Sequence, residues 1–121
     1  DTWNNRRRAI ARRYSEEITN PLICKPITGK GNTHVFYVYV ITTENRNGLR
    51  KYLEENDIKT GVYFPVPFHK QRLFEGKYDN KEELNNAEYV ADHSLAIPMF
   101  PELTDEEIGC VINMINGWDG K

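Results

Sequence analysis

The sequence predicts an α+β domain with a small sheet of three to four mostly antiparallel strands covered by helices. Helical stripes alternate with short β-branched or aromatic runs in the order α, β, α, β, α, β, α. At 121 residues the chain is long enough to bury one hydrophobic core, and it holds no internal repeat or low-complexity linker. Helices packed on a small antiparallel or mixed sheet suit this pattern better than a doubly wound nucleotide-binding fold.

The first element is a helix that should end near Asn20, because Pro21 disfavours helical dihedrals in the residue before it. Its apolar residues recur at spacings of seven and four on one stripe: Trp3, Ile10, Tyr14 and Ile18. Five arginines of "RRRAIARR" cover much of the remaining surface, so this face is solvated or docked on an acidic partner. The chain opens in this helix with no preceding element, which we expect of a fragment cut from a larger protein.

The middle of the chain alternates extended and helical patterns. "LICKPI" is a short extended candidate, "TGKGN" a turn, and residues 34–42, "HVFYVYVIT", predict a strand buried on both faces at its centre. "NRNGLRKYLEEN" places Leu49, Tyr52 and Leu53 at i, i+3 and i+4, which predicts a short amphipathic helix. Ile58 then leads into a second strand over residues 60–64.

The C-terminal third predicts two further helices and a third strand. Turn signals in residues 75–80 precede a helix over residues 81–92, with an apolar face of Leu84, Ala87, Val90 and Ala91. "LAIPMFPEL" begins as a strand that Pro98 and Pro101 interrupt. Thr104 and Glu107 form a capping box for the last helix. Its apolar stripe consists of Ile108, Val111, Ile112 and Ile115.

Composition argues against several function classes. A net charge of −2 gives no overall attraction to nucleic acid or to an anionic membrane, and no apolar run approaches the roughly 20 residues that span a bilayer. Cys24 and Cys110 are interpreted as reduced core thiols of a cytoplasmic protein. The three histidines share no metal-ligand spacing, and neither a Gly-x-Ser-x-Gly elbow nor a complete phosphate-binding loop occurs.

The stretch "TGVYFPVPFHK", residues 60–70, contains the candidate site. Its two prolines restrict the backbone and reduce the entropy lost when neighbouring side chains are held for a ligand. Tyr63 and Phe64 offer flat apolar faces, while His69 can donate or accept a hydrogen bond near neutral pH. Proline-stiffened packing at a strand end explains the same residues, and their pattern alone does not separate the two interpretations.

Several blocks taken in order resemble one family. "WNNRRRAIARRY" is similar to a Trp-Asn-x-x-Arg-Arg-x-x-Ala-x-x-Tyr helix, "VYFPVPFH" to an Ile-His-Tyr-Pro-x-Pro-x-His loop, and "AEYVADHSLAIPMFPELTDEEI" to a final Ala-Glu to Thr-x-x-Glu segment. These are motifs of the DegT/DnrJ/EryC1/StrS-type sugar-nucleotide aminotransferases, which depend on pyridoxal phosphate. Tyr63 and Phe64 stand where the family usually has His-Tyr, so His69 carries over and the role of the first histidine does not.

The resemblance implies the C-terminal small domain of a fold-type I enzyme over residues 21–121, with residues 1–20 as the interdomain connecting helix. The parent enzyme would use pyridoxal phosphate to move an amino group, from glutamate, to a keto sugar linked to a nucleotide. It would be a cytoplasmic homodimer that binds neither nucleic acid nor membrane.

The resemblance also assigns roles within the chain. Because the Schiff-base lysine belongs to the large domain, this chain would hold no catalytic residue, bind no cofactor and lack activity alone. Tyr63, Phe64 and His69 would contact the substrate. The alternative is a stand-alone α+β module that binds a small ligand or regulates another protein, and a purely structural interaction domain is a third possibility.

Overall fold

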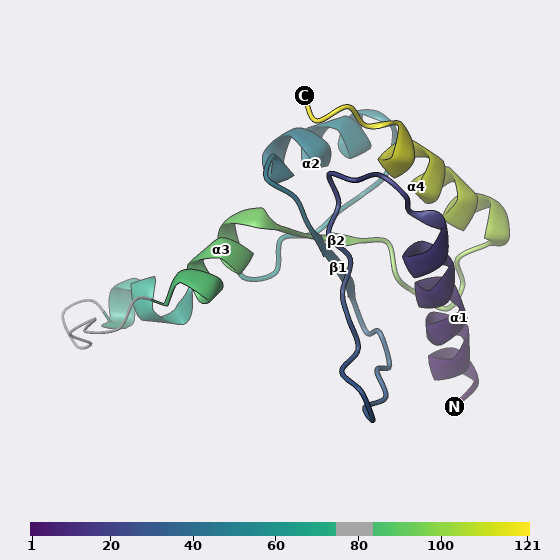
Figure 1. Ribbon diagram of the computed structural model, residues 1–121, viewed down its shortest axis with the longest axis horizontal. Helices are drawn as coiled ribbons and strands as arrows, with labels where there is room; N and C mark the ends of the chain where they lie inside the picture. Colours follow the sequence, from purple (N-terminus) through teal and green to yellow (C-terminus); the bar gives the residue numbers. More distant parts are fainter. Residues whose placement is uncertain (75–83) are drawn as a thin grey trace.

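The computed structural model describes residues 1–74 and 84–121, which form four α-helices around a small antiparallel sheet (Figure 1). The α+β class is therefore as predicted. In chain order the elements are α1 (Thr2–Glu17), β1 (Tyr39–Thr42), α2 (Arg46–Glu55), the 3-10 turns η1 (Phe68–Lys70) and η2 (Arg72–Phe74), α3 (Asn85–His93), β2 (Ser94–Ile97) and α4 (Asp105–Gly117). The turn predicted in residues 75–80 and the first turn of the helix predicted from residue 81 lie outside the described residues.

The sheet has two strands in the described part of the chain, flanked by two single-residue bridges. β1 and β2 pair antiparallel. Cys24 bridges to Thr42 through backbone hydrogen bonds of 2.8 and 3.0 Å, and Gly61 bridges to Ala96 through bonds of 2.9 and 2.8 Å. The "LICKPI" and 60–64 segments thus lie beside the sheet as predicted, but each pairs at one residue. Pro26 helps to limit the first of them, since proline has no N–H to donate to a ladder.

The strand predicted over residues 34–42 is shorter and more exposed than expected. Phe36 has φ 51°, in the left-handed region, so extended pairing begins only at Tyr39. Residues 25–38 instead form an arm that projects below the sheet in this view, on the same side as the N-terminal half of α1 (Figure 1). Within the strand, Tyr39 and Ile41 are buried whereas Val40 is half-buried. The prediction of burial on both faces is wrong because the described helices that build the core cover one face.

That covered face forms the core. Side chains from β1 and β2 pack against α1, α2 and α4, and the residues with no exposed surface include Ile10, Tyr14, Tyr39, Ile41, Leu49, Leu53, Leu95, Ile108 and Ile115. The rings of Tyr14 and Tyr39 meet edge to face with centroids 5.2 Å apart. The helical stripes predicted from spacing in α2 and α4 are therefore part of the core, through Leu49 and Leu53 of α2 and through Ile108, Val111, Ile112 and Ile115 of α4.

The stripe predicted on α1 is buried in its C-terminal part only. Ile10, Tyr14 and Ile18 are buried, but the Trp3 side chain is 66% exposed. Helix α4 begins at Asp105, which contacts Arg6 and Arg13 of α1. The first turn of α1, which carries Trp3, extends past this contact (Figure 1). The prediction that Trp3 joins the packed stripe is wrong for this reason.

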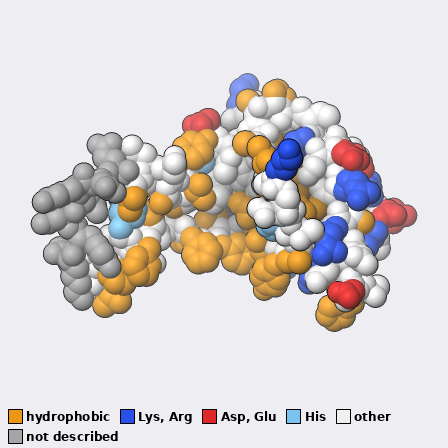
Figure 2. Space-filling view, turned by 60° about the horizontal axis from the view of Figure 1, so that its bottom comes forward, with side chains coloured by type: hydrophobic (Ala, Val, Ile, Leu, Met, Phe, Trp, Pro, Cys, Tyr) orange, Lys and Arg blue, Asp and Glu red, His pale blue; other side chains and the backbone are white. Residues whose placement is uncertain are grey.

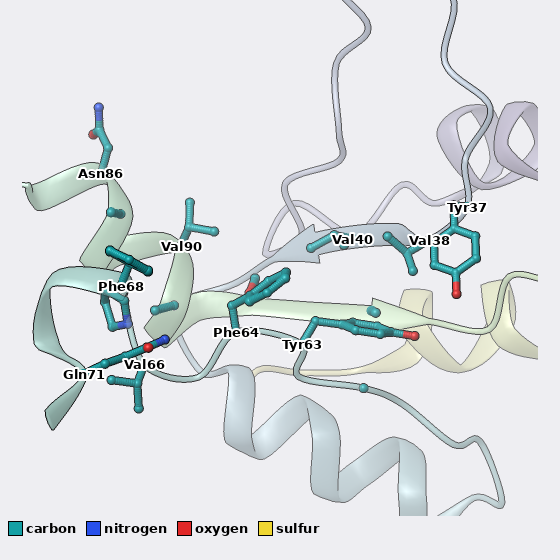
Figure 3. Close-up of a pocket in the computed structure, with 16 residues that line it drawn as sticks. Tyr37, Val38, Val40, Tyr63, Phe64, Val66, Phe68, Gln71, Asn86 and Val90 are labelled. Carbon is teal, nitrogen blue, oxygen red and sulfur yellow. The ribbon is translucent and has the colours of Figure 1, made fainter. Parts of the chain in front are cut away.

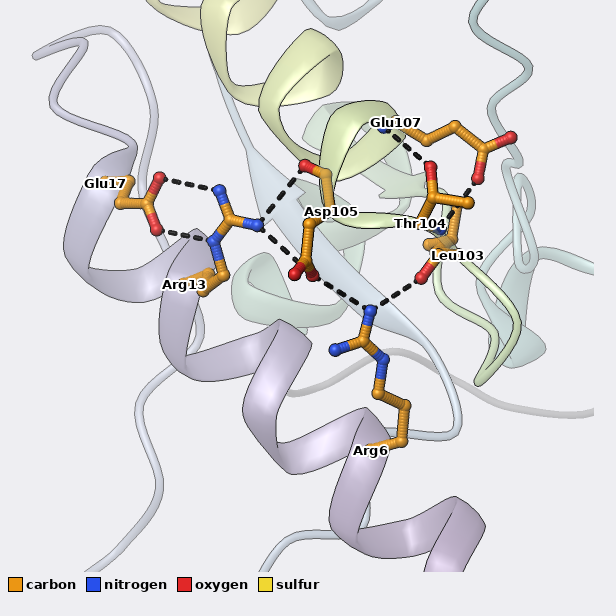
Figure 4. Close-up of polar contacts among 7 residues, drawn as sticks. All are labelled: Arg6, Arg13, Glu17, Leu103, Thr104, Asp105 and Glu107. Carbon is orange, nitrogen blue, oxygen red and sulfur yellow. Dashed lines mark hydrogen bonds and ion pairs between the residues drawn. The ribbon is translucent and has the colours of Figure 1, made fainter.

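Two arginines of the basic segment dock α1 onto the N-terminal end of α4 (Figure 4). Arg6 donates to the Leu103 carbonyl at 2.7 Å and to the Asp105 carboxylate at 3.0 Å. Arg13 pairs with Glu17 at 2.7 Å and lies 3.6 Å from Asp105. These arginines therefore have acidic partners within the chain, which accounts for part of the basic run without nucleic acid.

The other end of α1 is held by two asparagines. Asn20 is 8% exposed, and its Nδ2 donates to the carbonyls of Ile115 at 2.7 Å and Trp118 at 2.9 Å. Asn116 Oδ1 accepts from the Thr19 and Asn20 amides at 2.8 and 3.2 Å. Asn116 Nδ2 also donates at 2.9 Å to the carbonyl of Glu17, one of those that the C-terminal end of α1 leaves without an intrahelical partner. The helix expected to connect two domains is thus bound into this unit at both ends.

Both cysteines are exposed, so the interpretation of Cys24 and Cys110 as core thiols is wrong. Cys24 lies at the edge of the sheet, where its backbone bridges to Thr42. Cys110 lies on α4 between the buried positions Ile108 and Val111, and at 100° per residue it turns toward solvent. As for membranes, the helices of the described residues include none with the length and apolar character of a spanning segment.

Candidate functional site

The uncovered face of the sheet opens onto a groove with a volume of about 890 Å³ (Figure 3). Its floor consists of Val40 of β1, Ser94 and Ala96 of β2, and Val38, the residue before β1. Strand side chains alternate between faces, so the residues next to Tyr39, Ile41, Leu95 and Ile97 necessarily point away from the core. The groove is thus the second face of the same small sheet.

The candidate loop forms one wall of the groove. Tyr63 and Phe64 line it, and their side chains remain 59% and 80% exposed. In Figure 3 both rings project from the loop into the space beside the strands. Gly61 lies just below: a Cβ atom there would come within 3.2 Å of the Tyr63 ring. A side chain at position 61 would therefore require the exposed Tyr63 ring to shift by a few tenths of an ångström.

Helix α3 forms the other wall with Asn86, Ala87, Val90 and Ala91. Three of these belong to the apolar face predicted from sequence, and the fourth predicted residue, Leu84, is 45% exposed. Arg46 holds the C-terminal end of the helix by donating from Nη1 to the carbonyls of Ser94 at 3.1 Å and Ala91 at 3.4 Å. Arg46, which lies at the start of α2, therefore satisfies carbonyls at the end of α3.

His69 lies on the α3 side of the loop. Its side chain is 9% exposed, and Nε2 lies 3.1 Å from Glu88 Oε1 on α3. The groove lining includes its neighbours Phe68 and Gln71 but not His69. The structure thus brings Tyr63 and Phe64 together on the groove and places His69 behind them, so substrate contact by His69 remains a prediction.

The chemistry of the groove favours binding over proton transfer. Its titratable lining residues are Tyr37 and Tyr63, whose hydroxyls both lie at the end away from α3 (Figure 3). Amide groups of Gln71 and Asn86 lie at the other end, and apolar surface lies between them. Within residues 1–74 and 84–121 there is no cluster of three metal-ligating side chains. Flat apolar walls with polar groups at the ends suit a ligand that has apolar faces and polar edges.

Hydrophobic side chains continue across the surface around the groove. Figure 2 shows them gathered along the lower side of this view, between the α3 end and the main body. Exposed aromatic residues of the groove lining are Tyr37, Tyr63, Phe64 and Phe68. Contiguous exposed apolar surface of this kind marks a binding or contact region rather than ordinary surface.

Sequence reasoning missed Glu88 and the sheet floor. Val38 and Val40 were expected to be core residues, although strand alternation with one covered face would have assigned them to the groove. Glu88 is the second residue of the Ala-Glu motif in the sequence, but nothing in that motif pairs it with His69, which lies 19 residues away, and only the packing of α3 brings the two together.

The described elements form an α+β arrangement that matches a portion of fold-type I aminotransferases. The chain belongs to the DegT/DnrJ/EryC1/StrS aminotransferase family, whose sequence profile matches residues 1–116. It corresponds to the C-terminal portion of family members.

Relatives agree with this assignment. The chain is 31% identical over 116 residues to the dTDP-3-amino-3,6-dideoxy-alpha-D-galactopyranose transaminase of Aneurinibacillus thermoaerophilus, covering 96% of this chain and 31% of the relative. It is 36% identical over 118 residues to the "Pleiotropic regulatory protein" of Geobacillus stearothermophilus, covering 95% and 32%. The chain therefore spans about a third of the length of these curated relatives.

Solved structures share the fold over nearly the whole chain. S. venezuelae DesV in complex with a ketimine intermediate superposes with a TM-score of 0.92 at 31% identity, covering 98% of this chain and 32% of that one. A DegT/DnrJ/EryC1/StrS aminotransferase from Brucella abortus gives a TM-score of 0.88 at 29% identity, with the same coverage of both chains. The arrangement of the described elements is thus that of the family.

Proposed function

We propose that this chain is the C-terminal part of a pyridoxal-phosphate-dependent aminotransferase that moves an amino group from glutamate to a nucleotide-linked keto sugar. Residues 21–121 are its small domain, and residues 1–20 are the helix that leads from a large domain. The observation that carries the proposal is the aromatic groove, which lies in a chain 31% identical to a named sugar-nucleotide transaminase. The enzyme is proposed to be a cytoplasmic homodimer.

The described residues do not by themselves fit pyridoxal phosphate. The groove lining contains no lysine to bind the cofactor and no arginine to pair with its phosphate. Nearby Lys70 is engaged by Glu88 instead. In the proposed enzyme the cofactor is held by the large domain, and this chain contributes one wall of the acceptor site.

This wall of the groove is proposed to bind the acceptor and to set the shape of its site. The Tyr63 and Phe64 rings offer apolar faces to a sugar or a base, and the Tyr37 and Tyr63 hydroxyls offer hydrogen bonds at one end. Because the rings are already exposed and are carried by a loop containing Pro65 and Pro67, little ordering is needed when a ligand binds.

The test uses the full-length gene product. Incubated with glutamate and a panel of nucleotide-linked keto sugars, it should form the amino sugar of at least one, detected as a mass change of the nucleotide sugar. Phe64→Ala should raise KM for that acceptor about tenfold, in line with the roughly 1.4 kcal/mol a stacked ring contributes. Ile27→Ala, which alters a 93% exposed residue of the arm, is the matched control. Absence of turnover on every acceptor refutes the proposal.

The 121-residue chain alone provides a second test. Mixed with pyridoxal phosphate and reduced with borohydride, it should give no stoichiometric adduct at a single lysine, and it should have no transaminase activity. A specific adduct would show that this chain carries its own cofactor lysine.

A regulatory or ligand-binding module is the second candidate, favoured by the name of the Geobacillus stearothermophilus relative. This candidate predicts that the chain alone binds a small ligand in the groove with a change in melting temperature. Turnover by the full-length protein together with no ligand-induced shift in the isolated chain would reject it.

A further inference from the structure

One carboxylate joins the candidate loop to α3. Glu88 Oε1 lies 3.1 Å from His69 Nε2, and Glu88 Oε2 lies 2.5 Å from Lys70 Nζ. An ionised carboxylate only accepts hydrogen bonds, so the His69 proton resides on Nε2. Two consecutive residues of η1 are therefore bound by the two oxygens of a single side chain on the opposite wall of the groove.

We propose that Glu88 is a positioning residue that fixes the loop of residues 62–74 against α3 and so holds the aromatic wall of the groove in place. In this assignment His69 contacts α3 and does not line the groove, and Glu88 affects ligand binding only through its contacts with His69 and Lys70. The part of the inference that concerns substrate affinity rests on the proposed function.

The geometry of η1 links the anchor to the groove. Successive side chains of a 3-10 helix diverge by about 120°, so holding His69 against α3 sets the direction of Phe68, the residue before it. Phe68 lines the groove, and its ring lies 4.1 Å from that of Phe74 by centroids. Release of His69 would let the Phe68 side chain change direction in the groove.

Electrostatics support an ionised anchor at neutral pH. Hydrogen bonds from Lys70 and then from His69 lower the pKa of the Glu88 carboxyl below its usual value. The Lys70 side chain is half exposed, so its ion pair is screened by solvent and contributes little on its own. The directional His69 contact, on a ring that is 9% exposed, gives the loop its fixed orientation.

Limited proteolysis of the 121-residue chain tests the anchor without reference to function. Glu88→Ala should raise the initial rate of tryptic cleavage after Arg72 by about fivefold or more, because cleavage follows local opening of the loop. The amide oxygen of Glu88→Gln still accepts one hydrogen bond, so the cleavage rate of this variant should lie between those of the unmodified chain and Glu88→Ala.

The matched control is Glu44→Ala. This carboxylate accepts from Tyr89 at 2.9 Å and lies 3.5 Å from His93 Nε2, so it contacts the same helix but not the loop. Its cleavage rate should stay within about twofold of the unmodified chain, since removing an exposed contact elsewhere leaves the loop closed. Unchanged cleavage in Glu88→Ala, or an equal rise in Glu44→Ala, overturns the proposal. Far-ultraviolet circular dichroism checks that each variant is folded. If Glu88→Ala does not fold, the cleavage rate of Glu88→Gln tests the proposal instead.

Kinetics of the full-length enzyme test the link to the groove. Glu88→Ala should raise KM for the keto-sugar acceptor about tenfold and change kcat less than about twofold, the pattern of lost acceptor binding. Combined with Phe64→Ala it should add little, because both changes remove the same wall. Fully additive effects, or a loss confined to kcat, overturn this part. An unmodified enzyme without turnover refutes the proposed function instead, and the proteolysis result still decides whether Glu88 anchors the loop.

Discussion

Removal of the Asn20 side chain tests whether the helix expected to connect two domains is an integral part of this unit. Asn20→Ala deletes the two Nδ2 bonds to the Ile115 and Trp118 carbonyls, and it deletes the bond of 3.0 Å that Oδ1 accepts from the Leu22 amide. Since Asn20 is 8% exposed, water does not simply replace these contacts. We therefore expect removal of this one side chain to lower the free energy of unfolding clearly.

The magnitude follows from the number of hydrogen bonds lost. Three bonds of about 1 kcal/mol each are removed, while the Ile115 carbonyl still accepts from the Trp118 amide at 3.3 Å, so the free energy of unfolding should fall by about 3 kcal/mol. For a domain of this size that corresponds to a melting temperature lower by roughly 10 °C. Asn20→Asp should be at least as destabilising at pH 7, because it places a carboxylate beside two carbonyl oxygens.

The assay is urea unfolding followed by circular dichroism at about 222 nm, with linear extrapolation to water. Asn47→Ala is the control, because Asn47 is exposed and its side chain only accepts from Arg46. It should change the free energy of unfolding by less than about 0.5 kcal/mol. A loss below about 1 kcal/mol in Asn20→Ala would refute the reasoning, since the buried bonds would then be dispensable.

Three further changes have defined outcomes. Thr104→Ala removes the capping box of α4 and should cost about 1 kcal/mol by the same urea assay. Burial raises the pKa of Tyr14, so the fold favours its neutral phenol; this contribution is complete below about pH 10 and is lost as pH rises through the folded-state pKa. The stability gap between the unmodified chain and Tyr14→Phe should therefore shrink above about pH 10, and a constant gap would contradict this. Phe64→Ala should leave stability within about 0.5 kcal/mol and lower the fluorescence of a groove-bound apolar dye, whereas Ile27→Ala should leave the fluorescence unchanged.

Helices were the predictable part of this fold. The stripes of α2 and α4 and the capping box at Thr104 and Glu107 depend on residues within one or two turns of each other, so sequence spacing contains the needed information. Strand lengths were less predictable. Phe36 is aromatic and suits a strand, yet its left-handed backbone ends the extended run, because pairing depends on partners far along the chain.

The candidate site was predicted in part. Tyr63 and Phe64 do line the groove, and their exposure agrees with a role at a surface. The expectation that His69 faces the substrate stays a prediction, because the described lining does not include it and its ring lies against Glu88. Sequence shows that an imidazole follows two prolines, but the direction of that ring depends on the turn of η1 and on a carboxylate from another helix.

The α+β class, the helices of the core, the family resemblance and the aromatic character of the loop could all be inferred from the sequence. Each of these depends on residue type and short-range spacing. The packed structure was needed to show which face of the sheet is covered, where the groove lies, that Arg6 and Arg13 contact Asp105, and that Glu88 contacts His69. These depend on contacts between segments distant in the chain, and such contacts are fixed only when the elements pack.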